Sequence, residues 1–144
     1  MRGGTAGVLG LIAGLGAAGA QERDRCADFA WPLAAERSML AEAPMVENGG
    51  AVPLGQARRV ATPLLAEANL PAPPERRFEG AESIRAAFVT ADTAASRVQI
   101  TLSADAWVDV VQDGRYLRSL GSTGHRGCPG LRKSVRLTPV AHPS

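Results

Sequence analysis

The sequence has few of the side chains that hold transition metals. It contains two cysteines and two histidines among 144 residues. A zinc site of four cysteines is therefore excluded, and a site of two cysteines and two histidines would need every one of them. No CxxC or HxxxH spacing supports such a site. We therefore expect neither a metal centre nor a cofactor.

The sequence also lacks an excess of charge of either sign. Sixteen Lys and Arg residues face fourteen Asp and Glu residues, for a formal net charge of +2. This balance argues against nucleic acid as a partner, because domains that bind it usually carry a basic excess. Hydrophobic residues make up 45% of the chain and charged residues 21%, which excludes wholesale disorder. The length allows one domain.

The first twenty residues have the pattern of an export signal. Met1 and Arg2 precede an uncharged, apolar stretch over residues 5–20, which ends in the small residues 18–20. The stretch is shorter than the ~20 residues that span a bilayer. We expect cleavage after Ala20, no transmembrane segment in the mature chain, and a soluble periplasmic or secreted protein. Charged residues directly before Cys26 argue against a lipoprotein.

Export changes the interpretation of the two cysteines. In an oxidising compartment, Cys26 and Cys128 most simply form one disulfide, which would enclose nearly the whole mature chain. The alternative is a redox-active or metal-binding Cys128, since His125 precedes it with HxxC spacing. Two ligands alone do not make a metal site.

The mature chain divides into three segments of one domain, residues 21–144. Residues 21–43 are expected to hold a short helix from about residue 31 to 43, with Pro32 in its first turn and Pro44 ending it. Residues 44–80 are rich in proline and are expected to be irregular, with short strands at 51–54 and 56–62. Residues 81–144 form the β region. Within it, residues 84–89 fit both a helix and a strand, and we favour the strand.

The β region alternates apolar and polar residues with period two. Four short strands are predicted, over residues 97–103, 106–112, 116–120 and 131–137, and Asp113-Gly114 predicts a tight hairpin. In the last strand, Val135 and Leu137 would face the core, opposite Ser134 and Arg136. A single sheet cannot cover its own apolar face. We therefore expect a mainly β fold: a small antiparallel β-sandwich, jelly-roll-like, with one short N-terminal helix.

Residues 121–130 are the most unusual segment, with four glycines and one proline. The ordinary interpretation is a long loop with special backbone angles, held by the disulfide. The functional interpretation is a patch for an anion or polar ligand, and its candidate residues are His125, Arg126, Arg132 and Lys133. Because residues 132–134 alternate faces on a strand, only part of this set is expected to converge. The segment lacks the GxxxxGK[ST] order of a phosphate-binding loop.

Trp107 and Asp109 lie two residues apart on a predicted strand. Sugar-binding sites use a carboxylate beside a stacking aromatic ring, so both are candidate ligand-binding residues. The ordinary interpretation is that Asp109 pairs across strands with Arg118 or another Arg. No GxSxG motif is present for a serine hydrolase, and no catalytic residue is assigned.

Three stretches, CADFAWPL at 26–33, TLSADAWVDVVQDG at 101–114 and GCPGLRKSVR at 127–136, together resemble a family of small exported proteobacterial proteins. Some of its members carry the label homogentisate 1,2-dioxygenase, an iron enzyme with His and Glu ligands. This chain offers only His125 and His142, so its residues do not support that activity. The family pattern continues with a further β segment, so the resemblance implies that this chain lacks a C-terminal strand.

Two functional hypotheses follow. The first is a non-catalytic β-sandwich module that binds a polar ligand, a glycan or another envelope protein. The second is a small hydrolase or metal-dependent enzyme that uses His125, which would need a concave site beside an Asp or Ser. The thin inventory of catalytic residue types favours the first.

Overall fold

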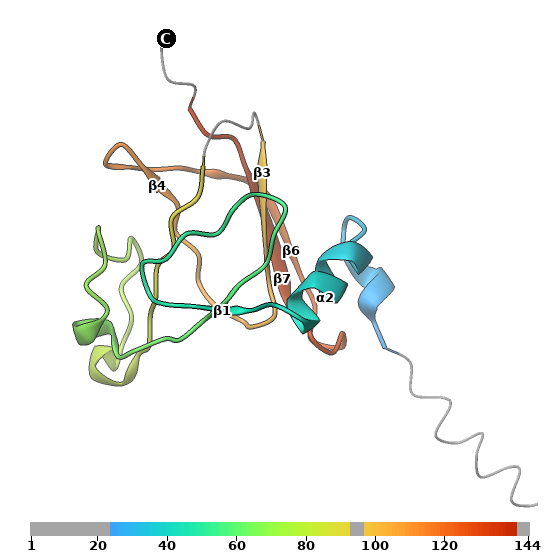
Figure 1. Ribbon diagram of the computed structural model, residues 1–144, viewed down its shortest axis with the longest axis horizontal. Helices are drawn as coiled ribbons and strands as arrows, with labels where there is room; N and C mark the ends of the chain where they lie inside the picture. The colour runs from blue at the N-terminus through green and yellow to red at the C-terminus, as the bar shows by residue number, and fades with distance from the viewer. Residues whose placement is uncertain (1–23, 93–96, 141–144) are drawn as a thin grey trace, which may run out of the picture.

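The computed structural model describes residues 24–92 and 97–140, so the predicted signal at 1–20 lies outside the described residues. One α-helix, α2 (Ala34–Ala41), precedes a series of short strands (Figure 1). Within the described part of the chain, no helix is long and apolar enough to cross a membrane. The strands are β1 (Met45–Val46), β2 (Arg59–Val60), β3 (Val98–Leu102), β4 (Val111–Gln112), β5 (Arg115–Tyr116), β6 (Ser119–Gly124) and β7 (Lys133–Leu137). The predicted mainly β class with small antiparallel sheets and one N-terminal helix is confirmed.

The central element is a three-stranded antiparallel sheet in the order β3-β7-β6. Ile100 of β3 lies opposite Val135 of β7, and Val98 lies opposite Leu137. Opposed residues share a face, so these four apolar side chains form one apolar surface, as the alternation predicted. Val135 and Leu137 are buried, at 7% and 2% exposed.

The opposite face of the sheet is also covered, which the alternation did not predict. A polar row crosses it, formed by Thr101, Ser134 and Thr123, and Ser134 is fully buried. The indole N–H of Trp31 donates to Ser134 Oγ at 3.2 Å, and the Ala30 amide donates to Thr123 Oγ1 at 2.9 Å. The N-terminal segment therefore packs on this face and satisfies its polar groups.

A small hydrophobic core joins this N-terminal segment to the end of the chain. It contains Phe29, Leu33, Cys128 and Leu131, with Leu40 packed against it. Leu33 is 2% exposed and has a non-helical backbone, with φ −133°. Anchoring of Leu33 in the core therefore delays the helix, which begins at Ala34 and leaves Pro32 outside it. The predicted start at residue 31 was wrong for this reason.

The predicted disulfide between Cys26 and Cys128 is present. It joins residues 102 positions apart, with the two Cα atoms 4.6 Å apart. The Arg25 amide donates to Gly127 O at 2.9 Å, and Arg37 Nε on α2 donates to Pro129 O at 2.8 Å. We call this set of links the clasp.

The middle segment, residues 44–92, lies on the side of the sheet away from α2 (Figure 1). Its strands are shorter than predicted: β2 pairs with β1 in parallel over two residues, and Ala51 makes an isolated bridge to Thr90. Residues 84–89 form no regular strand, and Arg85 alone bridges to Leu64. Scattered backbone bonds, such as that from the Gly49 amide to Phe88 O at 2.7 Å, and side-chain bonds hold this segment together. Asn48 donates to Ala68 O and accepts from the Phe88 amide, both at 2.8 Å.

The Asp113-Gly114 hairpin is confirmed. The two residues have φ of 53° and 77°, and they join β4 to β5 with Gln112 opposite Arg115. Two consecutive positive φ values are those of the tight turn that favours Asp-Gly. The strand before it is shorter than predicted, because only residues 111–112 pair. Beyond β7, Gln112 exchanges two hydrogen bonds with the Val140 backbone, at 3.0 and 2.8 Å. Residues 141–144 lie outside the described residues, so the absence of a further strand stays a prediction.

We predict that Gly114→Ala destabilises the protein by about 1–2 kcal/mol, because an alanine there must adopt a left-handed backbone. Gly121→Ala is the matched control. Both glycines face open space, but only Gly114 has a positive φ. Urea unfolding measures both variants. Equal stability of the two would contradict the assigned turn.

We predict that the double variant Cys26→Ser/Cys128→Ser loses about 2–5 kcal/mol of stability, because the disulfide closes almost the entire domain. Urea unfolding of the variant and of the oxidised parent measures the loss. Thiol alkylation before and after reduction is the control for the parent. Two freely alkylated thiols in the non-reduced parent would show that the bridge does not form.

Candidate functional site

An open hollow of about 560 Å³ lies at the end of β6 and the start of β7. The sequence analysis singled out His125, Arg126, Arg132 and Lys133, and all four line it. They converge more fully than strand alternation predicted, because Arg132 precedes the first residue of β7. The remaining lining residues are Asp105, Ser122, Thr123 and Gly124.

Part of the predicted 121–130 loop is a strand, which corrects the sequence analysis. Residues 121–124 belong to β6 and pair with residues 133–136 of β7. Only Gly130 among the four glycines has a positive φ. Gly124 lies opposite Lys133, and a Cβ atom there would lie 3.3 Å from the Arg132 carbonyl oxygen. Glycine thus permits a close approach of the two strands here and not an unusual backbone.

The hollow carries more positive than negative charge. Arg126 is exposed and contacts no carboxylate within residues 24–92 and 97–140. Lys133 Nζ donates to a carbonyl oxygen, that of Ala106, at 3.1 Å. Arg132 pairs with Asp105 at 3.1 Å, and the Asp105 side chain is 66% exposed. Three cations therefore face one solvated carboxylate.

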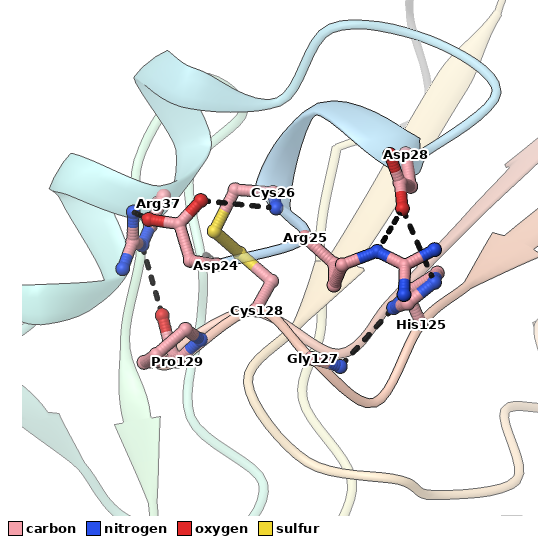
Figure 2. The surroundings of a disulfide bond; sticks show 9 residues. All are labelled: Asp24, Arg25, Cys26, Asp28, Arg37, His125, Gly127, Cys128 and Pro129. Atoms are coloured by element: carbon pink, nitrogen blue, oxygen red, sulfur yellow. Dashed lines mark hydrogen bonds and ion pairs between the residues drawn. A yellow bond between two sulfur atoms is a disulfide. The ribbon is translucent and has the colours of Figure 1, made fainter. Parts of the chain in front are cut away.

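His125 contacts a neighbour through each of its ring nitrogens: Nδ1 makes a hydrogen bond and Nε2 lies near a carboxylate (Figure 2). Its Nδ1 accepts the Gly127 amide at 3.1 Å, so the neutral ring carries its proton on Nε2. That nitrogen lies 3.6 Å from Asp28 Oδ2, and the same carboxylate oxygen also accepts from Arg25 Nε. The histidine therefore links the N-terminal turn to the turn before Cys128.

This geometry bears on the enzyme hypothesis. An acidic neighbour of His125 is present, as that hypothesis requires. A general base, however, needs a free nitrogen lone pair toward its substrate. In His125 the lone pair on Nδ1 is taken by Gly127, and Nε2 bears the proton. Over residues 24–92 and 97–140, no three His, Cys, Asp or Glu side chains gather as a metal site would require. His142 lies outside the described residues.

Trp107 and Asp109 lie outside the hollow. Asp109 accepts the Trp107 indole N–H on Oδ1 and the Glu75 amide on Oδ2, both at 2.9 Å. Arg118 pairs with the Glu75 carboxylate at 2.8 Å. The predicted pairing of Asp109 with Arg118 was therefore wrong. Asp109 instead ties the proline-rich connector to the β region, because the backbone of Glu75 supplies the donor.

The sequence analysis missed Asp28 and Asp105. Asp28 lies two residues after Cys26, and His125 lies three residues before Cys128. The disulfide that was predicted would have brought them together. Asp105 lies between two predicted strands, and the pairing of Leu102 with Lys133 places it beside Arg132. In both cases the contact joins residues far apart in the sequence, so no local pattern indicated it.

Comparison of the chain with models of protein families, with curated proteins and with solved structures found no match. The resemblance to small exported proteins therefore stays a prediction.

We predict that His125→Ala speeds amide exchange at Gly127 and costs about 1–2 kcal/mol of stability, because the amide loses its acceptor. His125→Asn is the matched control, since its Oδ1 occupies nearly the position of Nδ1 and keeps an acceptor there. Hydrogen exchange followed by NMR measures both. Exchange at Gly127 that is the same in both variants would contradict the bond.

Proposed function

We propose that this protein is an exported, non-catalytic binding module, and that the hollow between β6 and β7 takes a polar, negatively charged ligand. The observation that carries the proposal is the convergence of Arg126, Arg132 and Lys133 on one open hollow with a single carboxylate. Lys133 donates to a carbonyl oxygen, and Arg126 contacts no carboxylate among the described residues, so both keep hydrogen-bonding capacity for an anion.

The surroundings of the cations support a binding role. Ser122 adds an exposed hydroxyl group to the lining of the hollow. A hydroxyl donates a hydrogen bond to an anionic oxygen without taking a proton from it. The alternative is an enzyme that uses His125, and its hydrogen bond from Gly127 argues against that role, because a base must have a free lone pair.

Two features support export to the periplasm or the medium. The disulfide that closes the domain is the kind of bond that persists in oxidising compartments. The apolar stretch at 5–20, with small residues at 18–20, has the order of a cleaved signal. In such a compartment, the partners to be considered are small polar molecules, glycans and other envelope proteins.

We predict that Arg126→Ala weakens binding of glucuronate to the hollow about three- to tenfold, since an exposed charged contact contributes roughly 0.5–1.5 kcal/mol. Arg115→Ala is the matched control. Arg115 is likewise exposed, but it lies in the β4-β5 hairpin away from the hollow. Titration with glucuronate followed by NMR amide shifts measures both, and glucose serves as the neutral ligand.

The expected shifts fall on residues 122–126 and 132–133. Binding of glucose as tight as that of glucuronate would overturn the proposal, because charge would then contribute nothing. Shifts confined to other parts of the chain would place the ligand elsewhere and would equally overturn it.

A further inference from the structure

A second feature lies beside the hollow and shares a residue with it. Trp107 is 48% exposed. Lys133 Nζ lies 5.8 Å from the centre of its ring, and Lys133 also lines the hollow. An exposed aromatic ring and the cationic hollow are therefore neighbours, with the lysine between them.

A further cation lies near the same ring. The Arg76 guanidinium is 5.3 Å from the centre of the Trp107 ring and 5.4 Å from that of Phe78. Arg76 is exposed, and no carboxylate contacts it in the described parts of the chain. We use the name cation–aromatic row for Arg76, Trp107, Lys133 and the arginines of the hollow, Arg126 and Arg132.

Two cations, Arg76 at 5.3 Å and Lys133 at 5.8 Å, therefore lie near the centre of the Trp107 ring. We infer that the row binds an acidic oligosaccharide chain, with one carboxylate in the hollow and a neighbouring sugar ring against Trp107. This inference rests on the proposed function, because it uses the hollow as its anionic subsite. Each sugar of a uronic acid polymer carries a carboxylate and an apolar ring face, so one sugar can place its carboxylate in the hollow while the next contacts the exposed indole.

The row fits this ligand better than a single nucleic acid strand. Proteins that bind single strands without sequence preference stack successive bases on several aromatic side chains, within a strongly basic groove. Here one large ring, Trp107, is exposed beside the hollow, and the whole chain has a net charge of only +2.

Two adjoining subsites predict that affinity depends on ligand length. Binding at the hollow raises the effective concentration of the next sugar at Trp107, so the second contact adds to the first. We expect tri-galacturonate to bind at least about tenfold more tightly than galacturonate. The affinity of the trimer should fall as salt is raised, because exposed charges are screened.

The experiment is calorimetric titration of the full mature chain with galacturonate, tri-galacturonate and a neutral trisaccharide. Trp107→Ala should abolish the gain with length, measured as the ratio of the affinity for tri-galacturonate to that for galacturonate. Trp107→Phe keeps a ring and should keep most of the gain, although it also loses the indole N–H to Asp109. Arg76→Gln should reduce the gain in affinity with ligand length. It should do so without loss of stability, because Arg76 is exposed. Arg115→Ala is the matched control.

The outcomes separate this inference from the proposed function. Binding of galacturonate at the hollow with no gain for the trimer would overturn the acidic-chain inference and leave the proposed function in place. The acidic-chain inference would likewise be overturned, and the proposed function left in place, if the neutral trisaccharide showed the same increase in affinity over galacturonate as tri-galacturonate does. Tighter binding of a trinucleotide than of tri-galacturonate would assign the row to nucleic acid instead. Absence of binding by every anion would overturn both.

Discussion

The disulfide between Cys26 and Cys128 is the constraint on which the rest of the structure depends. It fixes two segments that lie 102 residues apart in the sequence. The contacts between these two segments follow from the position that the bond gives them. Arg25 reaches Gly127, Arg37 reaches Pro129, and Asp28 reaches His125. Gly127 shows how close this approach is, because a Cβ atom there would lie 2.5 Å from Arg25 Cγ. A side chain at this position would force Arg25 or the turn to shift.

The clasp also explains how a sheet of three short strands is covered on both faces. With Cys26 fixed, the following residues pass over the polar face, where Trp31 contacts Ser134 and lies 4.0 Å below the Arg136 guanidinium. The other face is apolar and lies toward the irregular middle segment (Figure 1). A thin sheet has little apolar area to bury. The covalent bond compensates by holding a covering segment whose own contacts with the sheet are largely polar.

What could be predicted from the sequence depended on local patterns. Alternation located β3 and β7, Asp113-Gly114 located the hairpin, and the cysteine count gave the bridge. Tertiary contacts decided the rest. Leu33 left the helix because the core holds it, and Ser134 became buried because Trp31 donates to it. In the middle segment, the Asn48 side chain joins Ala68 to Phe88, beside a backbone bond from Gly49 to Phe88 O, and no local pattern indicated these contacts.

The same distinction applies to the candidate site. The types of residue at 125, 126, 132 and 133 indicated an anionic ligand, but no local pattern showed that all four converge, because that depends on the pairing of Gly124 with Lys133. Nor did the sequence show how His125 is used. The histidine that looked most like a catalytic residue has its lone pair bonded to the turn beside Cys128. That bond spans Arg126, so the turn beside the disulfide also carries one of the cations that line the hollow.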